Sequence, residues 1–201
     1  MNRTVSLLIS TIFHPVFINL LSLISLMLFV PVLKYGMSDS LKLFYLIFIF
    51  TLTGILPIGA VSILKYSGNV KSFLLQEKKE RMIPYIITAV LYLFTYYLSK
   101  SLLHSQHIII AYLLACSCIV AAVMFITIFD KISIHMASIG AFAAIVVSMV
   151  NLANFDVRIL LAIILVFAGL TATARMFANS HLPYQLYCGF FLGFIIMYFI
   201  I

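Results

Sequence analysis

Long apolar stretches, separated by only a few polar residues, make up most of this sequence. A helix needs about 20 residues to cross the hydrocarbon core of a bilayer. Seven stretches approach or exceed that length, at roughly 6–33, 41–64, 83–103, 108–129, 132–153, 157–177 and 183–201. Strands of a membrane barrel would alternate apolar and polar residues over about ten positions, and these stretches do not. The pattern predicts an all-α, polytopic membrane protein, a bundle of six to seven transmembrane helices.

The composition agrees with this prediction, because 65% of the residues are hydrophobic and only 8% are charged, against about a quarter in soluble domains. No internal repeat or linker divides the chain, so we expect a single integral membrane domain over residues 1–201. The net charge of +7 suits anionic lipid headgroups or phosphate. The sequence lacks the basic and aromatic surface of a nucleic-acid binder, and we expect no nucleic-acid partner.

The first apolar stretch contains one interruption, His14-Pro15. Proline cannot continue the hydrogen-bonding pattern of a preceding helix, so a break or kink is expected there. We interpret His14 as a residue with a local hydrogen bond at this kink rather than as a catalytic group.

The segment Ala174–Gly193 carries most of the unusual polar residues. Asn179 and Ser180 are good helix-capping residues, and Pro183 is tolerated in a first helical turn. A helix break is therefore predicted between Arg175 and the last stretch. The residues of the new helix that recur every four positions, and so share one face, are His181, Gln185, Gly189 and Gly193. This stripe indicates either a polar site or tight helix packing, since small residues line helix contacts in membranes.

Counting membrane crossings places several distant segments on the same side. Two crossings return the chain to the same face, so the connections 65–82, 130–131 and 179–181 should lie together. They bring with them Lys78, Lys79, Arg81, Ser133, His135, Arg175 and His181. The sequence therefore predicts a basic cluster with two histidines at one face of the membrane.

These residue types suit phosphate chemistry without a metal. Arginine and lysine bind phosphate oxygens, and two histidines can divide the roles of nucleophile and acid. Few carboxylates lie near the cluster, only Asp130 besides Glu77 and Glu80, and no Asp-rich motif for a magnesium diphosphate is present. The cysteines lie in apolar runs and are interpreted as buried thiols, neither disulfide nor metal ligands: Cys116, Cys118 and Cys188. We expect no metal and no cofactor.

Three short segments resemble the motifs of one enzyme family. They read K-K-E-R-M-I-P at Lys78–Pro84, S-I-H at Ser133–His135 and A-R-M-F-A-N-S-H-L-P-Y-Q at Ala174–Gln185. In this order they are similar to the three motifs of the type 2 phosphatidic acid phosphatase superfamily, in its bacterial form. The resemblance implies a phosphatase-like core over about residues 65–201.

The resemblance also implies roles for individual residues. His181 would be the nucleophile that becomes phosphohistidine, and His135 the acid that protonates the leaving group. Gln185 stands where the family has an aspartate that orients the nucleophile. The residues implied to hold the phosphate are Lys78 or Lys79, Arg81, Ser133 and Arg175. The implied activity is metal-independent hydrolysis of a lipid phosphate or diphosphate. The implied substrate is of polyprenyl or glycerolipid type, and the implied surroundings are membrane lipids.

The departures from the family pattern support a second hypothesis. Gln185 replaces the aspartate, Ile134 a glycine and Ala174 a serine. A glutamine can orient a histidine but cannot neutralise its positive charge. The alternative is therefore a catalytically weak or inactive relative that binds or moves phospholipid, or that scaffolds a membrane complex.

The side of the membrane that carries the cluster has two interpretations. Eight of the 12 basic residues lie on the motif side, which by the distribution of positive charge would be cytoplasmic. Up to four of those eight are implied phosphate ligands, however. The resemblance to bacterial lipid phosphatases implies an extracytoplasmic site in the bacterial inner membrane, and we favour it.

Overall fold

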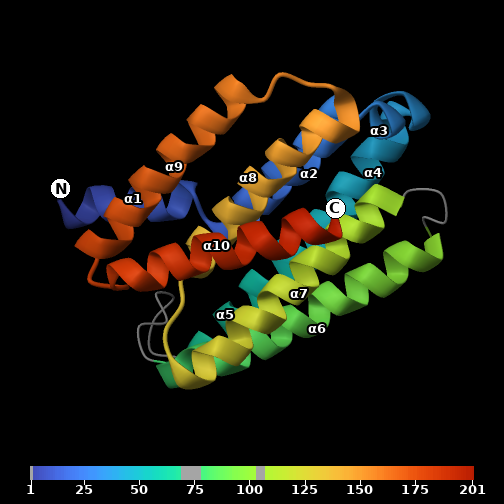
Figure 1. Cartoon of the computed structure of the whole chain (residues 1–201). Helices are drawn as coiled ribbons and strands as arrows, with labels where there is room; N and C mark the ends of the chain where they lie inside the picture. Colours follow the sequence, from blue (N-terminus) through green and yellow to red (C-terminus); the bar gives the residue numbers. More distant parts are fainter. Residues whose placement is uncertain (1, 69–77, 103–106) are drawn as a thin grey trace.

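The computed structural model describes residues 2–68, 78–102 and 107–201, which fold into helices with no strand among them (Figure 1). The elements are α1 (Arg3–Ile12), α2 (Pro15–Phe29), α3 (Pro31–Gly36), α4 (Asp39–Phe50), η1 (Thr51–Ile55), α5 (Leu56–Tyr66), α6 (Lys78–Leu102), α7 (His107–Phe129), α8 (Ile134–Ala153), α9 (Arg158–Phe177) and α10 (Pro183–Ile200). Within these described ranges, seven helical segments are long and apolar enough to cross a membrane. The protein is an all-α integral membrane protein, as the apolar stretches predicted.

The first membrane segment is broken where the sequence predicted. His14 precedes α2 as its N-cap, and its Nδ1 accepts a hydrogen bond from the Val16 N–H at 3.4 Å. Pro15 occupies the first turn of α2, where its missing N–H costs nothing. The expected span to residue 33 is wrong at its end, because α2 ends at Phe29 and a short helix, α3, starts at Pro31.

The second membrane segment contains a wide turn in its middle. The π-helix η1 separates α4 from α5, and Pro57 follows directly in the first turn of α5. Pro57 has no N–H to donate to the carbonyl of Thr53, so a regular α-helix could not continue through this point. A Cβ on Gly54 would lie 2.7 Å from Cγ1 of Val16. Glycine at this position therefore allows η1 to pack closely against α2.

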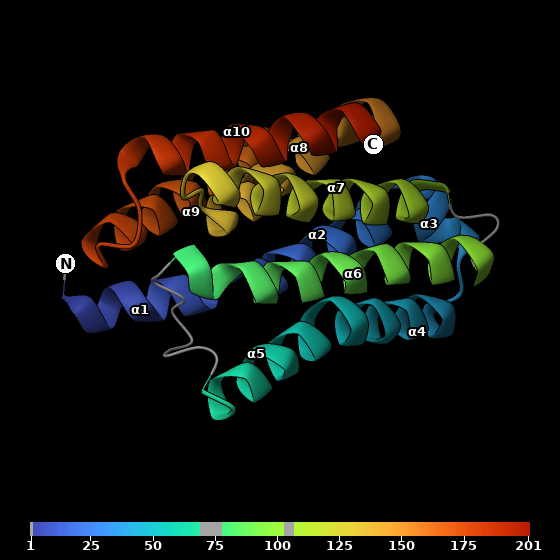
Figure 2. The same ribbon diagram turned by 90° about the horizontal axis from the view of Figure 1, so that it is seen from below.

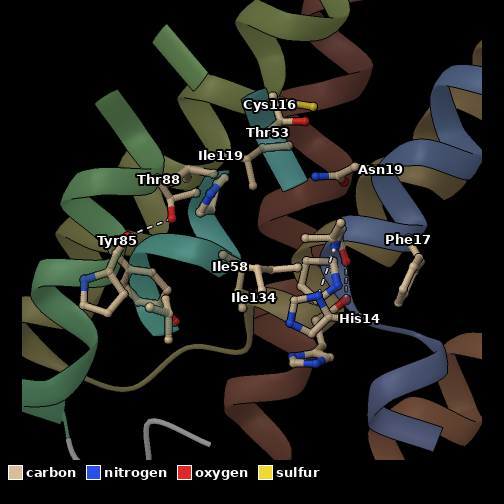
Figure 3. A pocket seen from close by; sticks show the side chains of 18 of the residues that line it. His14, Phe17, Asn19, Thr53, Ile58, Tyr85, Thr88, Cys116, Ile119 and Ile134 are labelled. Carbon is tan, nitrogen blue, oxygen red and sulfur yellow. Dashed lines mark hydrogen bonds between the residues drawn. The ribbon is translucent and has the colours of Figure 1, made fainter. Parts of the chain in front are cut away.

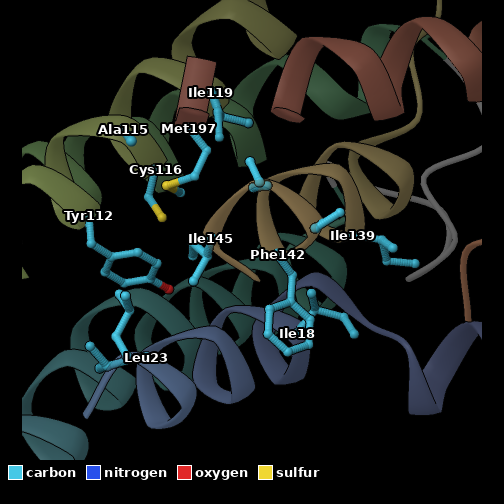
Figure 4. Close-up of a cluster of buried hydrophobic side chains, with 14 of the residues drawn as sticks. Ile18, Leu23, Tyr112, Ala115, Cys116, Ile119, Ile139, Phe142, Ile145 and Met197 are labelled. Atoms are coloured by element: carbon cyan, nitrogen blue, oxygen red, sulfur yellow. The ribbon is translucent and has the colours of Figure 1, made fainter. Parts of the chain in front are cut away.

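Helix α8 is the most buried of the described membrane segments. It lies against α2, α9 and α10, and apolar side chains such as Ile139, Phe142 and Ile145 fill the space around it (Figure 4). A Cβ on Gly193 would overlap the carbonyl group of Ala137. Helices α8 and α10 therefore pack with their backbones in direct contact, which small residues permit.

The two glycines of the predicted four-residue stripe lie on α10 and serve helix packing, whereas His181 precedes this helix. A Cβ on Gly189 would lie 2.5 Å from the Ser133 carbonyl oxygen, and Gly193 has the contact described above. The group that approaches them closely is the backbone of α8. Of the stripe, only His181 and Gln185 remain as candidate site residues.

The prediction of buried thiols holds for one cysteine and fails for another. Cys116 is buried, Cys118 is half-buried, and Cys188 is exposed on α10; all three are free. Lipid tails are as apolar as the protein core. An apolar run in a membrane protein therefore does not tell a buried face from a lipid-facing one.

The motif-bearing ends of the helices lie at one end of the bundle. The ends of α5, α7 and α9 and the beginnings of α6 and α10 lie at the left of Figure 2. The first helix, α1, starts at this same end and packs against α9. This arrangement agrees with the count of membrane crossings.

Candidate functional site

A cavity of about 440 Å³ opens among the helices at the motif-bearing end of the bundle (Figure 3). Its volume lies in the usual range for sites that bind small molecules. Five basic side chains line it, three from α6, α8 and α9 and two from the α1–α2 and α9–α10 connections: Arg81, His135, Arg175, His14 and His181. Four of these five were predicted to share one face of the membrane. We call this lined space the basic cavity.

The connection between α9 and α10 brings two of the basic residues together. Arg175 lies in the last turn of α9, and Asn179 then adopts a left-handed conformation with φ of 50°. The Ser180 N–H donates to the Arg175 carbonyl at 3.1 Å, which ends the helix in a compact turn. His181 follows this turn, so that both side chains line the basic cavity although six positions separate them.

Arg175 is buried without a counter-charge. Its side chain is 6% exposed, its Nε has no hydrogen-bond partner, and it forms no ion pair with any residue of the described ranges. Arg81 is also buried, at 3% exposure, and makes a hydrogen bond with Tyr85. Buried charges are costly unless they are paired. The cavity therefore presents positive charge, and the free Nε donor of Arg175, to a ligand that carries negative charge.

His181 is neutral in this setting. Burial, followed by the nearby charges of Arg175 and Arg81, lowers its pKa to about 3. Its Nδ1 lies 3.2 Å from Oε1 of Gln185. The same oxygen accepts the N–H of Leu182 at 3.1 Å, which identifies it as the oxygen end of the carboxamide. Nδ1 of His181 therefore carries the proton, and the lone pair is on Nε2, the arrangement of a nucleophilic imidazole.

Gln185 also connects His181 to a carboxylate. Its Nε2 donates to Oδ1 of Asp130 at 3.3 Å, and the Tyr184 hydroxyl donates to Oδ2 of Asp130 at 2.5 Å. Asp130 lies in the turn between α7 and α8 and is exposed. A chain of hydrogen bonds thus runs from the His181 ring through the Gln185 carboxamide to the Asp130 carboxylate. The sequence placed Asp130 near the cluster but assigned it no role.

Of the five basic side chains that line the cavity, His14 is the one that the sequence did not assign to the site. Its ring lies edge-on to that of His135, with 5.4 Å between the ring centroids and 87° between the planes. The predicted local hydrogen bond exists, but it uses only Nδ1. A signal was available, because His14 is polar, lies inside an apolar stretch and is near the motif-bearing end.

One of the predicted phosphate ligands, Ser133, does not join this group, and the side chains of two others lie outside the described residues. Ser133 is fully buried and does not line the basic cavity. Its Oγ accepts the N–H of Met136 at 3.4 Å, and its own N–H donates to the carbonyl of Gln185 at 3.3 Å. Lys78 and Lys79 begin α6, but their side chains lie outside the described residues.

Comparison of the chain with protein-family models, with curated proteins and with solved structures gives no match. The motif residues and the geometry of the basic cavity therefore have to carry any functional assignment. That geometry combines a neutral imidazole, two further imidazoles and two buried guanidinium groups around one space inside the bundle.

Proposed function

We propose that the protein is a membrane phosphatase that hydrolyses a lipid phosphate or diphosphate through a phosphohistidine, without a metal. This is the chemistry of the type 2 phosphatidic acid phosphatases, which the sequence motifs resemble. The observation that carries the proposal is the buried, unpaired guanidinium of Arg175 beside the neutral ring of His181. A phosphate group between them would supply the missing negative charge and accept a hydrogen bond from the free Nε–H of Arg175.

The reaction divides into two balanced steps. In the first, Nε2 of His181 forms a bond to phosphorus, the bond from phosphorus to the lipid oxygen breaks, and a protonated His135 gives its proton to that oxygen. In the second, water attacks the phosphohistidine, the N–P bond breaks, and the proton of the water returns to His135. Arg81 and Arg175 hold the phosphate oxygens, whose charge shifts in each transition state.

The hydrogen-bond chain to Asp130 supports activity despite the glutamine. During attack, positive charge develops on the His181 ring. Gln185 accepts a hydrogen bond from Nδ1–H and donates one to Asp130, so a carboxylate stabilises that charge from one residue further away. The aspartate expected in the family position is thus replaced by a glutamine with a carboxylate behind it.

Phosphate release by the purified protein tests the proposal. With EDTA present and a lipid phosphate in mixed micelles, we expect the unmodified protein to release phosphate. We expect the variants His181→Ala and His135→Ala to release phosphate at least about 100-fold more slowly. That is the smallest loss usually seen when a general acid is removed. The matched control is His107→Ala, since His107 is exposed at the start of α7 on the other end of the bundle. Release by His181→Ala at the unmodified rate would refute the proposal.

A charge exchange tests the chain of hydrogen bonds. Gln185→Asp alone removes the donor to Asp130 and places two carboxylates side by side, so we expect slower phosphate release. Adding Asp130→Asn restores one carboxylate and one amide with their order reversed, and the double variant should recover much of the rate. A double variant no faster than Gln185→Asp would show that Asp130 does not act through Gln185.

The alternative function, a weak or inactive relative that binds or moves phospholipid, is favoured by Gln185 itself, which cannot neutralise the ring of His181. This alternative predicts that the protein binds vanadate or a lipid phosphate but releases no phosphate. Phosphate release that depends on His135 would contradict it.

We also propose that the basic cavity opens on the extracytoplasmic side of a bacterial inner membrane. Ser180 lies in the turn beside the cavity and is half-buried, and Ser180→Cys provides a thiol of nearly the same shape. A membrane-impermeant thiol reagent should label this variant in intact cells, above the level of the parent protein. Extra labelling that requires broken cells would place the cavity on the cytoplasmic side.

A further inference from the structure

The basic cavity extends past its charged residues to a second, uncharged polar group. Asn19, Thr53 and Tyr92 line it further inside the bundle. In Figure 3 the Asn19 side chain points from α2 toward Thr53, and both lie well away from His14. We call these three residues the inner polar cluster. Polar side chains at this depth in a membrane protein are costly and mark functional positions.

The depth of the inner polar cluster follows from helix geometry. Asn19 lies five positions after His14 along the same chain segment, a rise of about 8 Å at 1.5 Å per residue. On α6, Tyr92 lies seven positions after Tyr85, the partner of Arg81, which corresponds to about 10 Å. A ligand whose phosphate lies among the cations would therefore reach this cluster with a group about 8–10 Å further along.

A chain of hydrogen bonds joins the three residues of the inner polar cluster but leaves one donor and the acceptor of the Asn19 side chain without a partner among the described residues. Nδ2 of Asn19 donates to the Tyr92 hydroxyl at 2.7 Å, and Tyr92 bonds to the hydroxyl of Thr53. Oγ1 of Thr53 donates to the Ile49 carbonyl at 2.8 Å, so each hydroxyl donates once and accepts once. The second N–H and the Oδ1 of Asn19 form no hydrogen bond within the part of the chain that the structure describes.

The backbone holds Asn19 in place for a ligand. The Tyr112 hydroxyl donates to the backbone carbonyl of Asn19 at 2.8 Å, which fixes α2 at this residue. From the other side, the π-helix η1 packs on α2 through Gly54 and presents Thr53. Single turns of π-helix occur often at functional sites, and a side chain held in this way is preorganised for binding.

We propose that Asn19 binds the ester carbonyl of an acyl lipid whose phosphate lies among Arg81, Arg175 and His181. This inference rests on the proposed function and identifies the substrate class of the same site. In an acyl glycerophosphate an ester carbonyl lies a few covalent bonds from phosphorus and can accept the free N–H of Asn19. A polyprenyl phosphate offers only hydrocarbon beyond its phosphate. It would leave the second N–H and the Oδ1 of Asn19 without a ligand partner, which sites of this kind disfavour.

Helix packing alone does not account for the same geometry. Polar side chains do join helices in membranes, and Tyr92 with Thr53 already joins α6 to η1. Asn19 adds one bond to this pair, lines the cavity, and keeps a donor and an acceptor without a partner among the described residues. A packing role would not require a carboxamide with four hydrogen-bonding positions of which one is used.

A pair of lipids that differ only in the carbonyl tests the proposal. A diacyl glycerol phosphate and its dialkyl ether analogue have the same phosphate and the same chains, but only the former has ester carbonyls. We expect the unmodified protein to hydrolyse the ester lipid with a kcat/KM about five- to tenfold higher, the value of one hydrogen bond. In Asn19→Leu the ratio should fall to about one. The matched control, Asn151→Leu, changes an exposed asparagine at the far end of α8 and should keep the ratio of the unmodified protein.

The outcomes separate this inference from the proposed function. Phosphate release with equal kcat/KM for ester and ether lipids in the unmodified protein would overturn the role of Asn19 and leave the phosphatase proposal standing. A ratio that Asn19→Leu does not change would do the same. Release from neither lipid would refute the phosphatase proposal, and the inference with it. The ratio in the unmodified protein needs no variant, so the test holds even if Asn19→Leu does not fold.

Discussion

Replacing Arg175 by methionine should change stability and ligand binding in opposite directions. The arginine is 6% exposed, its Nε has no partner, and it forms no ion pair within the described ranges. Arg81 also lies close enough to repel it. Methionine retains an unbranched apolar side chain and removes the charge. The ligand-free protein should therefore become more stable, while its affinity for phosphate should fall.

The size of both effects can be worked out from the surroundings of Arg175. An unsatisfied buried donor costs about 1–3 kcal/mol, and an unpaired buried charge costs at least as much. We expect Arg175→Met to raise the free energy of unfolding by about 1–3 kcal/mol. A hydrogen bond to a charged group contributes about 1.5–3 kcal/mol, so vanadate should bind about 10- to 150-fold more weakly.

Thermal unfolding in detergent micelles, with and without vanadate, measures both effects. The unmodified protein should gain stability with vanadate, and Arg175→Met should start higher and gain little. Arg158→Met is the matched control, since Arg158 is exposed and paired with Asp156 at 2.6 Å; it should keep the full response to vanadate. An Arg175→Met protein that is less stable when empty but responds normally to vanadate would show that the arginine is structural.

Two further predictions concern helix packing and proton binding. Gly193→Ala should destabilise the protein by about 1–3 kcal/mol in denaturant unfolding, because its Cβ would overlap the α8 backbone. Gly169→Ala is the control and should not destabilise the protein, since the space around Gly169 is open. Equal effects of the two changes would contradict the close contact. NMR titration of the His181 ring should show a pKa far below the ordinary 6.5 and a higher pKa in Arg175→Gln, which removes a repelling charge; an unchanged pKa would contradict that cause. Since the folded ring stays neutral while the unfolded one binds a proton, stability should decline as pH falls from 6.5 to about 3.

The membrane segments and their breaks could be predicted because their signals are local. Apolar length identifies a span without knowledge of its neighbours, and Pro15 and Pro183 each mark a helix start in the first turn. The common end of the motif residues followed from the number of crossings alone. This is why Arg81, His135, Arg175 and His181 could be grouped before the helices were placed.

Contacts between distant helices could not be predicted in the same way. The motif pattern placed Ser133 beside the phosphate, but the packing of α8 on α10 uses its N–H for the Gln185 carbonyl. The role of Gly193 depends on Ala137 of the facing helix. Likewise, 55 positions separate Gln185 from Asp130. None of these partners has a sequence signal of its own, since each depends on how two helices are rotated against each other.

His14 shows a different reason for an incomplete prediction. Its role as the N-cap of α2 was expected and is present, and that role was taken as a full account of the residue. A neutral imidazole has two nitrogens with separate hydrogen-bonding capacity, and capping occupies only Nδ1. The rest of the ring remains free to line the basic cavity and to contact His135. A histidine that caps a helix inside a membrane span should therefore be kept among the candidates for a site, because the cap accounts for only half of its polar atoms.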